Sequence, residues 1–423
     1  MKILQVNTFL KGGAANACIG LHSALISKGI DSRLLTLYSS SHSVPQVSVY
    51  QDMIDVLRRP LLTKVKDKIL AKRKQQQEAQ KREFLTKVSQ EADYFSFVKT
   101  PYNITRLDIF QEADIVNLHW VADFLDWPSF FSATNRKKIV WTLHDMHPFT
   151  GGYHYAGNYK GYQHNDHRYP PAQGTHLPDV AEQNLRAKKA VLRRFDSQFH
   201  VVTPSKWLSE VSQSSALFKN YPHYVIPNSV DTTLFRPLEK LFCRDLLGLP
   251  SDKTILLFVS HDVKKRRKGF KILLDSLPLL ANQNLLVCSV GHMPEPMDTG
   301  PVQHIPLRSI QDPRMMAVAY NAADAFVIPT LEDNLPNTVL ESIACATPVV
   351  GFSTGGVQDM IRDGFNGYIT ERKTSSGLVE VIQRFMNSNE KLDYEAIRRD
   401  AVERYSPTVQ ANAYTKLYQS ILT

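Results

Sequence analysis

Cysteine is scarce in this chain of 423 residues, which contains only Cys18, Cys243, Cys288 and Cys345. The four are widely separated and form no C-x-x-C pair, so the sequence excludes a disulfide framework and a zinc knuckle as the basis of the fold. Scattered single thiols suit a reducing compartment. We therefore expect a cytoplasmic protein.

Long apolar runs are absent as well. No uninterrupted apolar stretch approaches the roughly 18 residues that a membrane-spanning helix needs. The N-terminus, MKILQVNTFL, has a short apolar run broken by Gln5 and Asn7, and no small-residue cleavage site follows it. This pattern is typical of a first buried strand and not of a signal peptide, so the sequence predicts a soluble or peripheral protein.

Positive charge is concentrated in one segment. The net charge is +9, and between Arg58 and Lys87 eleven Lys or Arg residues stand against three acids. The spacing of apolar residues there predicts a helix within a basic insertion at about 53–91. Such a helix suits the anionic inner face of a plasma membrane, or it packs on its own domain with a solvated basic face, and both interpretations remain open. No recognised nucleic-acid module accompanies it, so we expect no nucleic-acid partner.

The length of the chain and its alternating pattern predict two α/β domains. A chain of this size exceeds what one hydrophobic core usually supports. Short apolar runs typical of buried parallel strands alternate with helical patterns in both halves. We predict an N-terminal domain at 1–226, a C-terminal domain at 227–395 and a C-terminal helix at 396–423 that packs towards the first. The expected strands are Ile3 to Val6, Arg33 to Leu37, Asp114 to Leu118, Lys138 to Leu143, Thr254 to Val259, Leu285 to Val290, Ala325 to Ile328 and Pro348 to Phe352.

The most informative run is PTLEDNLPNTVLES, residues 329–342, which follows an expected strand and opens a helix. Pro336 suits the first helical turn, and the backbone N–H groups of Asn337, Thr338 and Val339 then remain to bind a ligand. Unpaired amides and the positive end of the helix dipole favour an anion such as a diphosphate or a phosphate-linked sugar.

Two acids flank this helix start. Glu341 lies one turn into the helix, and its side chain leans back towards the N-terminus, where its carboxylate can accept hydrogen bonds from sugar hydroxyls. Asp333 lies on the other side. Acids near a helix start also occur as simple capping residues, so for Asp333 that interpretation remains open.

This run resembles the E-x7-E donor site of the family 4 retaining glycosyltransferases, continued by the strand segment ACATPVV. TPSKWL at 203–208, IPNSVD at 226–231 and the stretch from TGG to DGFNG at 354–367 are similar to further landmarks of that family. The likeness covers nearly the whole chain. It implies the GT-B fold, in which two facing Rossmann-like domains border an interdomain cleft, and it is closest in kind to bacterial exopolysaccharide and capsule transferases.

The resemblance assigns roles within the run, with one departure. Asp333, not Glu332, matches the family's first Glu, because seven residues separate it from Glu341. It implies that Glu341 binds the nucleotide ribose and that Asp333 contacts the sugar. The loop residues implied to bind the donor beside them are Asn334, Leu335, Pro336 and Asn337.

A second departure concerns the basic run after an expected strand, where family members often place an Arg soon after the strand and a Lys before a Gly. His261 occupies the nearer position, so Arg267 and Lys268 are the candidates for clamping the diphosphate. Two cations would neutralise the charge that develops on the departing nucleotide. A solvated basic loop is the alternative.

The N-terminal half supplies weaker candidates. Gly12 and Gly13 permit close backbone approach after the first strand, though G-G also serves ordinary turns, and they form no G-x-G-x-x-G fingerprint. The resemblance implies that this loop faces the donor phosphates or the acceptor. His144 follows another strand, and by resemblance it projects beside the transferred sugar, although a lone histidine at a strand end is often structural. His119 and Asp145 are candidates for the acceptor side, and Asp145 alternatively orients His144.

Residues 153–169 contain His154, His164 and His167 among five tyrosines, which raises the question of a metal site. Without thiolates or a tight ligand spacing, an acceptor-facing aromatic loop that includes Tyr153 is the favoured interpretation. The chain also lacks a D-x-D triplet, so we expect no metal-dependent diphosphate clamp and no cofactor.

The resemblance implies a retaining hexosyltransferase. It would move a hexose-type sugar from a UDP- or GDP-linked donor to a saccharide or lipid-linked acceptor, in a pathway that we interpret as bacterial surface polysaccharide synthesis. Fold does not fix chemistry, so an epimerase or phosphorylase of the same fold, or a non-catalytic basic surface-binding protein, remains an alternative.

Overall fold

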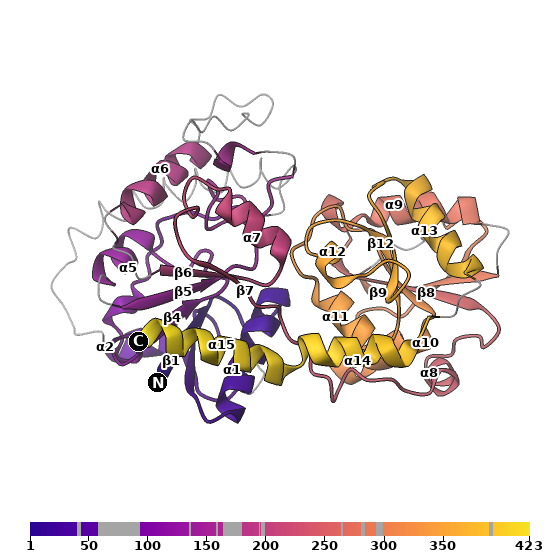
Figure 1. Ribbon diagram of the computed structural model, residues 1–423, viewed down its shortest axis with the longest axis horizontal. Helices are drawn as coiled ribbons and strands as arrows, with labels where there is room; N and C mark the ends of the chain where they lie inside the picture. Colours follow the sequence, from indigo (N-terminus) through magenta and orange to yellow (C-terminus); the bar gives the residue numbers. More distant parts are fainter. Residues whose placement is uncertain are drawn as a thin grey trace. The chain divides into compact units, whose positions relative to one another are not determined.

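The computed structural model describes residues 1–39, 44–57, 94–134, 137–157, 160–163, 180–193, 195, 199–263, 265–280, 284–292, 299–388 and 392–423 (Figure 1). It divides into two compact units. The first contains Met1–Thr203, Leu208–Tyr224 and Leu417–Thr423, and the second contains Pro204–Trp207 and Val225–Lys416. The predicted basic helix at 58–87 lies outside the described residues, as do His164 and His167.

The first unit is built on a seven-stranded sheet with the order β3-β2-β1-β4-β5-β6-β7, in which the pairs from β3 to β6 are parallel. All four residues of β4, at the centre, are buried, which is why these strands read as continuous apolar runs. The strands are β1 Lys2–Asn7, β2 Asp31–Thr36, β3 Val47–Val49, β4 Ile115–Leu118, β5 Lys138–Thr142, β6 Phe199–Thr203 and β7 His223–Val225. The helices are α1 Gly13–Ser27, α2 Tyr50–Leu57, α4 Asp108–Gln111, α5 Trp127–Ala133, α6 Val180–Leu192 and α7 Lys206–Gln213.

The second unit is built on a six-stranded parallel sheet with the order β10-β9-β8-β11-β12-β13. Its strands are β8 Thr254–Asp262, β9 Leu285–His292, β10 Gln303–Pro306, β11 Ala325–Ile328, β12 Val349–Phe352 and β13 Gly367–Thr370. Its helices are α8 Lys240–Leu246, α9 Phe270–Ser276, α10 Pro313–Ala322, α11 Asn337–Ala344, α12 Val357–Met360, α13 Ser375–Asn387 and α14 Tyr394–Tyr405, with α15 Pro407–Leu422 ending in the first unit.

Both faces of this second sheet are covered by helices (Figure 1). Successive side chains of a strand point to opposite faces, and Phe326 and Val327 of β11 accordingly join two different apolar clusters. Phe326 packs in the cluster that contains Val339 of α11, whereas Val327 packs in the cluster that contains Leu378 of α13. This two-sided burial is the doubly wound arrangement, in which ligand sites form at the carboxyl ends of the strands.

The structure confirms the predicted fold class of parallel α/β sheets in two units, and all eight expected strands are present. The C-terminal segment differs from the prediction of a single helix at 396–423. It forms α14 within the second unit and then α15, whose last residues belong to the first unit, where the Tyr418 hydroxyl accepts a hydrogen bond from Asn117 Nδ2 at 2.9 Å. Among the described residues, no helix has the length and apolar character needed to cross a membrane.

Candidate functional site

The candidate donor site lies at the carboxyl edge of the second sheet, in the loop that leaves β11 at Pro329 and enters α11. Pro336 is the N-cap of α11 and makes no side-chain capping bond. The amide of Val339 donates to Pro336 O at 3.0 Å, so the prediction that this N–H remains for a ligand is wrong. The Asn334 amide donates to Asp333 Oδ1 at 3.0 Å, which also commits it within the loop.

Three glycines allow neighbouring segments to pack directly on this loop. A Cβ on Gly269 would lie 1.8 Å from Pro329 O, and one on Gly355 would lie 1.9 Å from Asp333 O. A Cβ on Gly356 would lie 1.6 Å from Asn334 O. Gly269 and Gly355 also have φ of +70° and +53°, which other residues rarely adopt. The R-K-G and T-G-G sequences therefore mark the points where two other loops touch the donor loop backbone.

Arg267 and Lys268 meet the loop through Asp333. Lys268 Nζ lies 2.6 Å and Arg267 Nη1 lies 3.4 Å from Asp333 Oδ2, and Asp333 is only 7% exposed. Burial by itself would raise the pKa of Asp333, but the two cations outweigh it and hold the pKa below its ordinary value. The carboxylate is therefore ionised, and the three side chains carry a net charge of +1 at neutral pH.

Glu341 lies one turn into α11 and is half-buried. The hydroxyl of Tyr320, on α10, donates to Glu341 Oε2 at 2.9 Å. Burial raises the pKa of Glu341 to about 7, and the hydrogen bond from Tyr320 opposes that rise. Sequence reasoning did not single out Tyr320, because nothing in a periodic helical pattern marks a buried tyrosine as a partner of an acid 21 residues away.

His144 and His119 form a stacked pair in the first unit, with ring centroids 5.3 Å apart. His119 is buried and His144 is half-buried, and His119 Nδ1 lies 3.0 Å from His144 Nε2. His119 Nε2 is in turn 2.8 Å from Gln5 Oε1. Burial lowers the pKa of His144 to about 4 and that of His119 well below its ordinary value, so both rings are neutral at pH 7. His119 is thus placed to orient His144; its predicted contact with an acceptor remains a prediction.

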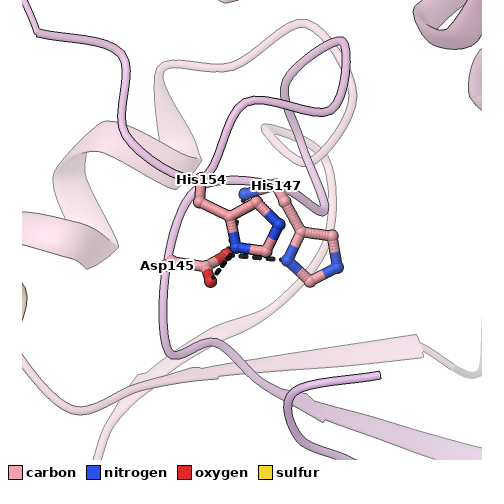
Figure 2. A group of neighbouring side chains, drawn as sticks. All are labelled: Asp145, His147 and His154. Carbon is pink, nitrogen blue, oxygen red and sulfur yellow. Dashed lines mark hydrogen bonds and ion pairs between the residues drawn. The ribbon is translucent and has the colours of Figure 1, made fainter. Parts of the chain in front are cut away.

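Asp145 is the centre of a buried hydrogen-bonded cluster, in which two imidazoles point at its carboxylate (Figure 2). Oδ1 accepts from the backbone N and Nδ1 of His147, at 3.0 and 2.7 Å. Oδ2 accepts from Nδ1 of His154 at 2.5 Å and from Nε1 of Trp120 at 2.7 Å. Four N–H groups use the acceptor positions of an ionised carboxylate. The arrangement therefore suits an orienting role for Asp145, whose predicted contact with an acceptor stays a prediction.

Asp145, His147 and His154 are also the group within the described ranges that could hold a metal ion, since their ligand atoms all lie within 4.8 Å of one another. A metal held through the two Nδ1 atoms would have to displace their protons, because imidazole binds metals through an unprotonated nitrogen. In the arrangement of Figure 2 those protons already satisfy the carboxylate. Sequence reasoning considered His154 but missed His147, which lies at the next-but-one position after Asp145.

The remaining candidates of the first unit lie at loop positions. Gly12 is the N-cap of α1 with φ of +99°, and Gly13 opens that helix. Both are exposed, so they are open to a ligand. Tyr153 is half-buried, and its ring packs edge-on against Phe95 with centroids 5.1 Å apart. The predicted roles of these three residues in binding remain predictions.

The sequence of the second unit is similar to that of known glycosyltransferases. Residues 253–388 match the sequence profile described as Glycosyl transferases group 1. D-inositol 3-phosphate glycosyltransferase 1 of Catenulispora acidiphila is 30% identical over 215 residues, 46% of this chain and 50% of that relative. Phosphatidyl-myo-inositol mannosyltransferase of Mycobacterium leprae is 27% identical over 206 residues, 47% of this chain and 54% of that relative. The chain thus spans about half the length of the curated relatives it matches.

A solved structure matches over nearly the whole chain. Anabaena HepE in complex with UDP and glucose gives a TM-score of 0.64 at 16% identity, covering 99% of this chain and 100% of HepE. This chain has the GT-B fold. At 16% identity, the likeness to HepE concerns the fold alone. The range that matches the group 1 profile, residues 253–388, contains Arg267, Lys268, Asp333 and Glu341.

A Gly356→Ala substitution tests the packing of the donor loop. The new methyl group would lie 1.6 Å from Asn334 O, so the loop must shift, and we expect a loss of roughly 1–3 kcal/mol in the free energy of unfolding. Gly364→Ala is the matched control, because a Cβ there meets nothing within 4 Å and only the backbone at φ +76° is strained. Chemical denaturation of both variants measures the difference. Because the strained φ of Gly364 has a cost of its own, the deciding quantity is the loss in Gly356→Ala, and a loss below about 0.5 kcal/mol would contradict the packing argument.

A Glu341→Gln substitution tests the burial of the Glu341 carboxyl. The folded-state pKa of about 7 lies above the ordinary value of 4.5, so the stability contributed by the protonated acid is fully present below pH 4.5 and is lost as pH rises through 7. The variant has no charge to bury. We expect it to be more stable than the wild type at pH 8 by on the order of 2 kcal/mol, and similar at pH 5, in urea melts. A pH-independent difference would contradict this assignment.

Proposed function

We propose that this chain is a glycosyltransferase that moves a hexose-type sugar from a nucleoside-diphosphate donor to a hydroxyl acceptor. One observation carries the proposal. Arg267 and Lys268 converge on Asp333 beside the start of α11, and Glu341 lies one turn into the same helix. The match of residues 253–388 to the group 1 transferase profile supports it, as does a fold shared with HepE, which was solved with UDP and glucose.

The diphosphate would bind to the cationic pair. Asp333 leaves the three side chains with one excess positive charge, and a diphosphate brings at least two negative charges to it. Charge-assisted hydrogen bonds from Arg and Lys to phosphate oxygens are among the stronger polar contacts in proteins, and the α11 dipole adds to them. As the sugar–phosphate bond breaks, negative charge grows on the leaving diphosphate, so the same cations stabilise the transition state.

Glu341 would accept hydrogen bonds from the ribose hydroxyls of the donor. Its half-buried position lets the carboxylate reach a ligand while the helix backbone stays packed. Asp333, Asn334, Leu335, Pro336 and Asn337 would border the sugar. Transfer would proceed with retention, and the departing phosphate would take the proton of the acceptor hydroxyl. His144, neutral and half-buried, would contact the transferred sugar as a hydrogen-bonding group and not as a cation.

The acceptor that we propose is a saccharide or a lipid-linked saccharide in bacterial surface polysaccharide synthesis. We propose that the enzyme is cytoplasmic and binds the inner face of the plasma membrane. The names of the two curated relatives add inositol phosphate and phosphatidylinositol as acceptors to compare. Product formation from radiolabelled UDP- and GDP-sugars, with each acceptor class in turn, separates these possibilities. It also separates transfer from epimerisation, which needs no acceptor.

A Lys268→Ala substitution tests the diphosphate clamp. Loss of the ammonium group 2.6 Å from Asp333 removes one of two cations, so we expect the affinity for UDP or GDP to fall by about tenfold to a hundredfold. Lys271→Ala is the matched control, since that side chain is exposed and, within the described part of the chain, pairs only with Asp275 on the same helix. Titration calorimetry on both variants is the measurement. Wild-type affinity in Lys268→Ala would remove this residue from the site.

We also propose that transfer needs no metal ion, because the cations and the α11 dipole supply the positive charge at the diphosphate. Turnover should therefore survive dialysis against EDTA with less than about a twofold change, since no ion contributes to leaving-group stabilisation. A Mg²⁺ or Mn²⁺ add-back series on the dialysed protein is the control. Activity lost to EDTA and restored by one of these ions would overturn metal independence.

A further inference from the structure

The hydroxyl of Tyr320 is the one hydrogen-bond donor that the described residues bring to the carboxylate of Glu341. It lies 2.9 Å from Oε2. Tyr320 is fully buried in α10, whereas Glu341 on α11 is half-buried. A fully buried phenol therefore holds one carboxylate oxygen of a residue that is itself only half-buried.

Tyr320 is itself held at several points. Its carbonyl accepts a hydrogen bond from Thr347 Oγ1 at 2.8 Å. Its ring packs edge-on against Phe326, with centroids 5.7 Å apart, and against Phe235, at 6.3 Å. A ring packed on two sides cannot turn to follow a mobile carboxylate. The carboxylate must instead take the orientation that the phenol imposes.

We propose that Tyr320 is a positioning residue, which fixes one carboxylate oxygen of Glu341 so that the other accepts hydrogen bonds from the ribose of a nucleoside diphosphate. This inference rests on the proposed function of the second unit. The phenol hydroxyl donates and the carboxylate accepts, so the contact favours the ionised acid. An ionised carboxylate has acceptor lone pairs on both oxygens, so it can accept hydrogen bonds from Tyr320 and from ribose hydroxyls together. A protonated carboxyl uses one oxygen as a donor and loses part of this capacity.

The buried position of the Glu341 carboxyl makes the hydrogen bond from Tyr320 necessary. Burial raises the pKa of Glu341 to about 7, so near neutral pH a substantial share of the acid is protonated, and the phenol hydrogen bond limits that share. Two titratable groups close to Glu341 keep their charge in this range. Cys345 has a thiol whose pKa burial raises far above neutrality, and Arg398 of α14, which donates to Ala344 O, stays cationic. The pH response of the site near 7 thus belongs to Glu341 and depends on Tyr320.

A Tyr320→Phe substitution tests the proposal, because it removes the hydroxyl and keeps the packed ring. The carboxylate loses its fixed orientation at every pH and its pKa rises as well. Relative to wild type, the affinity for UDP, GDP or ADP should therefore fall about tenfold at pH 6.5 and about three- to fivefold at pH 9, where the acid is ionised in both proteins. Calorimetric titrations of each nucleotide across this range give the ratio of variant to wild-type dissociation constants. In that ratio the titration of the phosphate itself cancels.

Three controls accompany the variant. Tyr405→Phe removes the hydroxyl of another tyrosine buried in the same core, and its ratio to wild type should stay near one at every pH. Glu341→Gln should bind weakly with no pH response of its own near 7. A 2′,3′-dideoxynucleoside diphosphate should bind wild type and Tyr320→Phe equally, since it presents no ribose hydroxyl to the carboxylate.

The possible results separate the inference from the function beneath it. A Tyr320→Phe affinity equal to that of wild type at pH 9, where Glu341 is ionised in both proteins, would overturn the positioning role while nucleotide binding stands. The positioning role also fails if Glu341→Gln keeps the affinity and pH profile of wild type. If wild type binds none of the three nucleotides at any pH, the proposed function itself fails and this inference fails with it.

Discussion

The contact between Asp333 and the adjacent cations Arg267 and Lys268 is the constraint on which the candidate site depends. Two neighbouring positive side chains repel each other, and a carboxylate that is 7% exposed loses most of its hydration. Each is tolerable only because the other is present, since buried charges must be paired. The contact between Asp333 and the two cations also links two separate segments, because the cations precede α9 while Asp333 precedes α11. Removing either partner would leave an uncompensated charge at the edge of the sheet.

Hydrogen bonds to backbone atoms also hold the segments of this site together. Leu331 N donates to Arg267 O at 2.6 Å, and Thr354 Oγ1 donates to Leu331 O at 2.8 Å. The segments that contain Arg267 and Leu331 are thus joined backbone to backbone, and Thr354 is joined to them by a short hydroxyl side chain. A site for a small anionic ligand needs such rigidity, because phosphate contacts lose strength quickly when donors are misplaced.

The sequence predicted the central strands because strands buried on both faces read as uninterrupted apolar runs. It did not predict β3, β7 and β10, whose sequences VSV, HYV and QHIP are short and half-exposed or more. It also missed β6, which is almost fully buried, and β13, which is buried in its first half. β3 and β10 lie at sheet edges and β7 ends the other side of the first sheet, where one neighbour is missing and the apolar signal is weakest. The apolar pattern thus identified eight strands of the two sheets and missed β6, in which His200 interrupts the apolar run.

The same limit applies to the candidate site. Motif spacing placed Asp333 and Glu341 at the start of one helix, because helix geometry is local and periodic. It could not place Tyr320 or His147, whose hydrogen bonds depend on which side chains the tertiary fold brings together. It also could not show that the amides of Asn334 and Val339 already have partners within the loop. Local geometry can be derived from sequence, whereas hydrogen-bond partners must be found in the fold.

The presence of a short acid at position 333 has a physical meaning in this loop. The side chain of Asp333 is one methylene shorter than that of Glu, and here its Oδ1 accepts from the next amide while Oδ2 accepts from Lys268. A short carboxylate that closes a turn with its own chain cannot extend into a ligand space at the same time. Its charge instead holds Lys268 and Arg267 in place beside the helix start. Recognition of the diphosphate would then be carried by the two cations, and Asp333 would act through them.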